Sequence, residues 1–345
     1  MEPVLTIAVP TYNMEWCLQK NLCTYCSDIL ENRLEVLILN NHSTDSSGKI
    51  AKTFCQKWPG IFRLLDRNTR GYGSSINEAL QAAKGKYFRI VDADDWVNTS
   101  ELEKLVERLE NCHIDIIQTD YAIEDMMTHR GTTITAKERG CQYEVVYNDF
   151  QAAIRLLPTL YSTTYRTELL RSTGFYMQDE TFFVDEEYIV LPFFQAKEMI
   201  CFPFVVYHYQ VANPEQSTSP KNRGKYASHR ERVLKRLIEE YQKAISQQKI
   251  IRPFVQEYCL ERIRRGVADH FTTLYIYVED RKAGRAAAKR WMKDIRSMGF
   301  DLQCHRKRMI LLLCNLLKIN PEDYVKLKNL STKRLLSYKS IFSRG

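Results

Sequence analysis

Three carboxylates stand within four residues in the segment Asp92-Ala93-Asp94-Asp95. Crowded carboxylates repel one another in a sheltered cleft, and a bound divalent cation offsets that repulsion. Mg²⁺ and Mn²⁺ prefer carboxylate oxygens and are often shared with the phosphates of a substrate. The segment therefore predicts a site for such a cation. The alternative is an acidic turn that caps the next helix, and the motif alone does not decide between the two.

Short apolar runs alternate with helical segments around this motif. Four runs have the composition of buried parallel strands, and each ends in a polar loop. The runs lie at residues 4–10, 34–39, 62–65 and 87–91, and helices are expected at about 15–30, from about 48, and at about 75–83. This alternation predicts an α/β fold, with a mostly parallel sheet flanked by helices.

The polar loops after these strands should meet at one place. They occupy residues 10–13, 40–45, 68–75 and 92–95. In open parallel sheets, ligands bind outside the carboxyl ends of the strands. The order of the elements therefore predicts one ligand site at this edge of the sheet, with the acidic motif in it.

Three segments carry a resemblance to a known family. Residues 4–13 contain LTIAVPTYN, residues 37–47 read LILNNHSTDSS, and residues 85–96 read GKYFRIVDADDW. In order, spacing and strand placement they resemble the family-2 glycosyltransferases of bacterial envelope and capsule synthesis, which have the GT-A fold. The resemblance is firm over residues 1–100, traceable to about 220 and absent beyond. It implies a hexosyltransferase that moves a sugar from a nucleotide-sugar donor to a hydroxyl of a glycan or lipid-linked acceptor.

The resemblance also implies which residues bind the donor nucleotide. Pro10, Thr11 and Tyr12 are expected to lie against the base, with Tyr12 stacked on it. Asn41 stands where the family often has an aspartate that pairs with uracil, which is a departure from the pattern. An amide offers both a donor and an acceptor to an imide edge, so a UDP-sugar is the first choice. Asn68 is expected to contact the base or the ribose.

The metal and diphosphate are expected at the acidic motif. By the resemblance, Asp92, Ala93 and Asp94 all belong to the nucleotide-sugar site. Asp92 contacts the ribose or the cation, and Asp94 binds Mn²⁺ or Mg²⁺ on the diphosphate. The cation would neutralise the leaving nucleotide. His208, in Tyr207-His208-Tyr209, is a candidate third ligand, although a lone histidine in an aromatic strand is more often only hydrogen-bonded.

A second acidic cluster provides the candidate general base. The family uses a carboxylate in a later acidic motif before a helix, and the matching segment here is Phe183-Val184-Asp185-Glu186-Glu187. Asp185 is the first choice and Glu186 the second. A base that activates the acceptor from the far face of the sugar would invert the anomeric centre. The alternative is an acidic helix N-terminus stabilised by the helix dipole.

Charge divides the chain into two regions. Residues 1–220 hold 20 Lys and Arg against 30 Asp and Glu, whereas residues 221–345 hold 30 against 12. The expected organisation is a catalytic domain over 1–220 and a basic helical C-terminal domain over 221–345. The basic region is expected to hold the acceptor, an anionic membrane surface or a partner subunit. The alternative is a solvated helical lobe whose cations supply solubility.

Several other classes are excluded or disfavoured. No apolar run approaches the 18 to 20 residues, roughly, that span a bilayer, and the start of the chain lacks signal-peptide character. A cytoplasmic protein is therefore expected. Peripheral attachment to the inner face of the membrane is an additional option for it. The 10 cysteines show no paired zinc-ribbon spacing. No recognition motif supports nucleic-acid binding. The runner-up function is a non-catalytic GT-A-fold partner subunit. Asn40 and Asn41, which stand in place of acids, favour it, whereas the intact Asp92/Asp94 pair opposes it.

Overall fold

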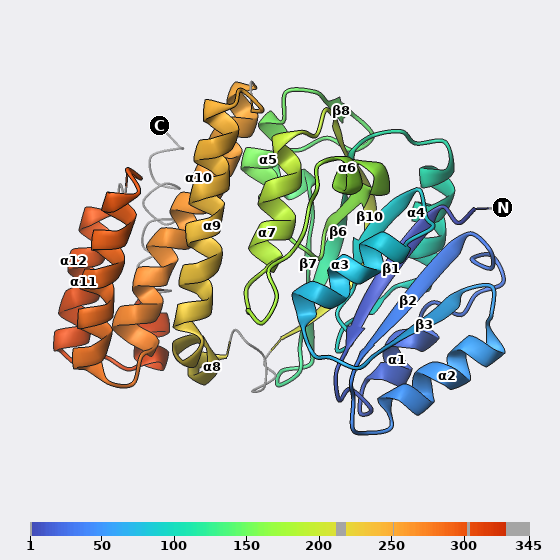
Figure 1. Ribbon diagram of the computed structural model, residues 1–345, viewed down its shortest axis with the longest axis horizontal. Helices are drawn as coiled ribbons and strands as arrows, with labels where there is room; N and C mark the ends of the chain where they lie inside the picture. The colour runs from blue at the N-terminus through green and yellow to red at the C-terminus, as the bar shows by residue number, and fades with distance from the viewer. Residues whose placement is uncertain (1, 212–218, 251, 302–303, 329–345) are drawn as a thin grey trace, which may run out of the picture. The chain divides into compact units, whose positions relative to one another are not determined.

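The computed structural model describes residues 2–211, 219–250, 252–301 and 304–328 (Figure 1). The chain forms two compact units. The first comprises residues 1–213 and 240–261, and the second comprises residues 214–239 and 262–345. The functional division at residue 220 that the charge pattern favours stays a prediction.

The described strands of the first unit form one mixed sheet (Figure 1). Its parallel part has the order β3 (Phe62–Arg67), β2 (Leu34–Asn41), β1 (Leu5–Thr11) and β4 (Tyr87–Ile90). The sheet continues through β9 (Thr163–Arg166), β6 (Ile116–Asp125), β10 (Met199–Val211) and β5 (Trp96–Val97), with β7 (Arg130–Ile134) on β6 and β8 (Val146–Tyr147) on β10. β1 and β2 are buried along their whole length, which explains why most of their residues are apolar.

Helices cover both faces of this sheet. α1 (Leu18–Cys23) and α2 (Ser47–Lys57) pack together, whereas α3 (Tyr72–Ala82) lies against β1 and β2. The chain reverses its direction of travel across the sheet after β3, so right-handed crossovers place α3 on the face opposite α1 and α2. The later helices are α4 (Thr99–Glu110), α5 (Gln151–Leu156), α6 (Thr167–Ser172) and α7 (Asp185–Val190), with 3₁₀ turns η1 (Lys137–Arg139) and η2 (Leu191–Phe194).

The four predicted strands are confirmed, but the helix expected at residues 15–30 is much shorter. α1 ends at Cys23, and the Thr24 hydroxyl donates to the Asn21 carbonyl oxygen at 2.6 Å. The chain then turns so that Tyr25 is fully buried, edge-on to Phe62 with ring centroids 6.3 Å apart. Burying a large aromatic side chain outweighs continuing a surface helix.

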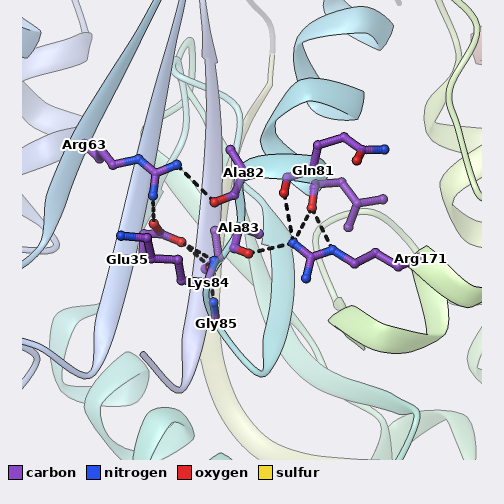
Figure 2. A network of polar contacts seen from close by, with 10 residues as sticks. Glu35, Arg63, Gln81, Ala82, Ala83, Lys84, Gly85 and Arg171 are labelled. Carbon is purple, nitrogen blue, oxygen red and sulfur yellow. Dashed lines mark hydrogen bonds and ion pairs between the residues drawn. The ribbon is translucent and has the colours of Figure 1, made fainter. Parts of the chain in front are cut away.

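A polar network at the amino ends of the parallel strands holds the connection between α3 and β4 (Figure 2). The Glu35 carboxylate pairs with Arg63 at 2.5 Å and accepts from the Lys84 amide at 2.8 Å. Arg171 of α6 donates to the free carbonyl oxygens of Leu80, Gln81 and Ala83 at the end of α3. These contacts satisfy backbone groups that a helix end leaves unpaired.

The C-terminal part of the chain is helical, as predicted. It contains α8 (Pro220–Lys225), α9 (Ala227–Ser246), α10 (Pro253–Thr272), a π-helical turn η3 (Thr273–Tyr277), α11 (Arg281–Ser297) and α12 (His305–Leu316). Within the second unit, buried His270 meets Trp291 edge-on, with ring centroids 5.0 Å apart. None of the described helices is long and apolar enough to cross a membrane.

Candidate active site

Strand register brings the predicted polar loops to one edge of the sheet. Thr11 lies opposite Asn40 in the β1–β2 pair, and Asn41 lies opposite Arg67 in the β2–β3 pair. On the other side Ala8 is opposite Ile90, so Asp92, two residues later, leaves the sheet beside Pro10. The carboxyl ends of all four parallel strands therefore meet as the sequence predicts.

Hydrogen bonds tie the first two loops together. The Asn13 amide donates to Ser43 Oγ at 3.1 Å, and the Thr44 amide donates to Asn13 Oδ1 at 2.8 Å. The Met14 amide donates to Ser47 Oγ at 2.8 Å. These bonds fix the path of residues 10–13, and they explain the serine-rich turn after β2.

Tyr12 and Asn41 both contact arginines that the sequence did not predict. The Arg70 guanidinium lies 4.4 Å from the centre of the Tyr12 ring, a cation–π contact. Arg67 donates to Asn41 Oδ1 at 2.5 Å and to Ser74 Oγ at 2.9 Å. The Asn41 side-chain oxygen therefore already accepts a hydrogen bond from Arg67. Asn68, just after β3, is exposed.

Buried polar side chains hold the acidic turn in place. Asn21 of α1 donates to the carbonyl oxygens of Asp92 and Asp95 at 3.1 and 2.9 Å, and Cys17 Sγ lies 3.3 Å from the Ala93 carbonyl oxygen. The Asp95 carboxylate accepts from the Tyr207 hydroxyl at 2.5 Å. It also accepts from the Gln210 amide at 2.7 Å.

Asp95 is therefore a structural residue that ties the acidic turn to β10. It is 2% exposed. The N-cap of α4 is Asn98, whose side chain accepts from the Glu101 amide, so Asp95 does not cap the following helix.

Asp92 faces the centre of the candidate site. Its Oδ1 accepts from the Tyr72 hydroxyl at 2.9 Å. Burial, followed by the nearby charges of Asp94 and Asp185, raises the pKa of Asp92 to about 7, while the Tyr72 hydrogen bond lowers it. Three carboxylates thus repel one another here, which is the electrostatic condition that a cation would relieve.

Asp185 belongs to the same group of charges, although it lies far away in the sequence. Besides raising the pKa of Asp92, its charge contributes to the raised pKa values of Tyr72 and Tyr161, both of which are raised mainly by burial. Glu186 is partly exposed on the same turn. The structure thus brings the two acidic clusters of the sequence together through Asp185.

Glu187 has a different task from the other acids of this cluster. It is fully buried, and its carboxylate accepts from the Gln178 amide and side chain at 2.8 and 2.5 Å. Glu187 therefore holds Gln178, in the segment before α7, in place by hydrogen bonds.

Two glycines join the loop after β3 to that segment. A Cβ at Gly73 would lie 2.0 Å from the Gln178 carbonyl oxygen, and one at Gly71 would lie 2.2 Å from Asp179 Oδ1. Asn77 of α3 and Met177 exchange two hydrogen bonds, of 2.9 and 2.8 Å. Glycine permits this close approach, so the helix that carries Tyr72 is fixed to the segment that leads to Asp185.

His208 is not brought to Asp92. Its Nδ1 lies 2.9 Å from Glu124 Oε1, and its ring stacks on Trp96 with centroids 5.5 Å apart. Neighbouring Tyr207 points to the acidic turn, and successive side chains of a strand alternate between faces. The structure therefore gives His208 the hydrogen-bonded, packed environment that the sequence leaves open as its alternative.

The donor set fits a cation shared with a substrate. Within the ranges that the structure describes, no three His, Cys, Asp or Glu side chains form a ready-made metal cluster. Mg²⁺ usually keeps waters and binds through one or two carboxylates plus substrate phosphates. Asp92 and Asp94 supply two such carboxylates, and the pKa of Asp92 is raised first by burial and then by the charge of Asp94.

The sequence did not predict that Tyr72 and Asn21 contact the acidic turn. Tyr72 is the first residue of α3, and Tyr161 stacks on Tyr209 with ring centroids 4.0 Å apart. The acidity of the site can be read from the sequence, but these neutral partners carry no spacing signal. Only the packing of α1, α3 and β10 around the acidic turn reveals them.

This arrangement defines a GT-A glycosyltransferase fold, and the comparisons agree. The structure of S. aureus TarS residues 1–349 in complex with UDP-GlcNAc superposes with a TM-score of 0.54 at 16% identity, covering 78% of this chain and 73% of that one. At that identity the likeness concerns the fold. Residues 6–174 match the family model described as glycosyl transferase family 2.

Curated relatives share the same region. The chain is 30% identical to the uncharacterized glycosyltransferase EpsJ of Bacillus subtilis over 34% of its own length and 33% of EpsJ. It is 32% identical to the glycosyltransferase GlyA of Streptococcus pneumoniae over 34% of its own length and 16% of GlyA. The matched region thus spans a third or less of these relatives.

Proposed function

We propose that the chain is an inverting, metal-dependent glycosyltransferase that moves a sugar from a nucleotide-sugar donor to a hydroxyl of a glycan or lipid-linked acceptor. The observation that carries this proposal is the convergence of Asp92, Asp94 and Asp185 beside the loops after β1 and β2. In this proposal the loops bind the nucleotide. A cation held by the carboxylates neutralises the negative charge of the departing diphosphate, and a carboxylate base removes the proton of the acceptor hydroxyl.

Each part of the site has a task in this proposal. Tyr12 and Asn41 hold the base, and Asn41 offers its NH₂ group to a base carbonyl. Asp92 and Asp94 would hold Mn²⁺ or Mg²⁺, which would neutralise the departing diphosphate. Asp185 is the first candidate to take the proton of the acceptor hydroxyl, because its charge reaches Asp92 and Tyr161.

UDP is the first nucleotide to test, since a neighbour in fold was solved with UDP-GlcNAc. The acceptor belongs to cell-surface polysaccharide synthesis in this proposal. The basic C-terminal region would hold the enzyme near that acceptor, through the acceptor itself, an anionic membrane or a partner subunit.

Thermal stabilisation by nucleotides, with and without Mn²⁺, tests the site directly. A ligand that binds only the native state raises the melting temperature by mass action. UDP with Mn²⁺ should raise it by a few degrees, roughly, and Asp94→Asn should remove the part that depends on Mn²⁺. A shift with another nucleotide would show that Asn41 changes the base preference. No shift with any nucleotide would overturn the proposal and favour a non-catalytic partner subunit.

A further inference from the structure

Helix α12 has apolar side chains on two opposite faces. One face is buried within the second unit and includes Leu311, at 1% exposure, and Asn315. Residues advance by about 100° each around a helix, so a second apolar set falls on the opposite side. It consists of Met309, Ile310, Leu313, Leu316 and Leu317, which are 48%, 52%, 56%, 56% and 73% exposed. These five residues are the exposed apolar face.

The exposed apolar face departs from the usual pattern of a surface helix. Such a helix turns its apolar stripe inward and its polar residues outward. Exposed apolar residues that are scattered singly are ordinary, whereas a contiguous set marks an interaction surface. Here five such residues fall within nine positions on one side of a single helix.

The surrounding charge indicates what this face meets. Residues 281–328 hold 13 Lys and Arg against 4 Asp and Glu. Exposed Arg306 and Lys318 lie at the two ends of the exposed apolar face, and exposed Lys326 and Lys328 follow. An apolar stripe with cations at its margins suits a helix lying in the headgroup region of an anionic bilayer.

We propose that the exposed apolar face of α12 docks onto an anionic lipid surface, with the helix in the plane of the membrane. The apolar side chains enter the boundary between headgroups and acyl chains, and the flanking cations meet lipid phosphates. Each Lys or Arg near such a surface adds to the attraction, which salt weakens. The argument uses the second unit alone, so it holds whether or not the transferase proposal does.

Vesicle flotation with the full chain and no donor tests this proposal. Vesicles of phosphatidylcholine with about 30% phosphatidylglycerol should bind the protein at least about tenfold more strongly than phosphatidylcholine alone, and salt should reduce the difference. Leu313→Ser with Leu317→Ser should lower the partition coefficient at least about tenfold without changing the net charge. The matched control, Ile29→Ser with Met127→Ser, also removes two exposed apolar side chains, which are 56% and 78% exposed, and should bind as wild type does.

A second pair of variants separates charge from apolar contact. Arg306→Gln with Lys318→Gln should reduce the preference for anionic vesicles while leaving the melting temperature unchanged. Equal binding of the Leu313/Leu317 variant and wild type would overturn the proposal. So would vesicle binding that appears only after residues 329–345 are deleted, since that segment would then be the occupant. Self-association of wild type that the Leu313/Leu317 variant abolishes, without vesicle binding, would show an interface between copies instead.

Discussion

Removing the Tyr72 hydroxyl should shift the pH dependence of metal binding. Tyr72 donates to Asp92 Oδ1 at 2.9 Å, and this bond stabilises the ionised carboxylate. A hydrogen bond to a charged group contributes about 1.5–3 kcal/mol, and one pKa unit corresponds to about 1.4 kcal/mol. Tyr72→Phe should therefore raise the pKa of Asp92 from about 7 by a further one to two units, roughly.

The assay is the Mn²⁺ affinity in the presence of UDP, measured across about pH 6 to 9. A carboxylate binds the cation only when it is ionised, so affinity should fall about tenfold per pH unit below the pKa of the group. In Tyr72→Phe this fall should begin one to two pH units higher, roughly, than in wild type. Asp92→Asn should bind Mn²⁺ weakly at every pH, as a control. Superimposable wild-type and Tyr72→Phe profiles would refute the reasoning.

Three further predictions concern other parts of the chain. Gly73→Ala should lower the free energy of unfolding by about 1–3 kcal/mol in urea titrations, because the new Cβ would lie 2.0 Å from the Gln178 carbonyl oxygen. Asp185→Asn should keep UDP-dependent stabilisation but lose at least about a hundredfold in turnover, whereas Glu186→Gln should retain most turnover. Burial lowers the pKa of His270, so the unfolded state protonates first, and stability should fall as pH drops below about 6.5. His270→Gln should flatten that dependence in thermal unfolding between about pH 5 and 7.

Their controls are equally specific. A Cβ at Gly174 would meet nothing within 4 Å, although its φ is +65°, so Gly174→Ala should show only the backbone cost of about 1 kcal/mol. A larger loss there than at Gly73 would contradict the steric argument. Normal turnover of Asp185→Asn would move the base to Glu186 or elsewhere. A pH profile of stability that His270→Gln leaves unchanged would assign the effect to other groups.

The sequence by itself determined the sheet and the edge where the site lies. A continuous apolar run such as Val36–Leu39 is stable in a sheet covered on both faces, and alternation with helices favours parallel strands. Because the carboxyl ends of parallel strands lie at the same edge of a sheet, the sequence alone places Asp92 and Asn41 at one edge. Local pattern carries such information, since a strand or a helix is a property of neighbouring residues.

The tertiary structure decided which residues meet at that edge. Three features of the site depend on elements far apart in the sequence. The charge of Asp185 acts on Asp92, the Tyr72 hydroxyl donates to Asp92, and His208 contacts Glu124 instead of the acidic turn. The same holds for α12, whose apolar run reads equally well as core or as surface. Burial of Leu311 and exposure of Leu313 are set by which side of the helix faces the rest of its unit. Long-range packing fixes these choices, and no local spacing in the sequence encodes them.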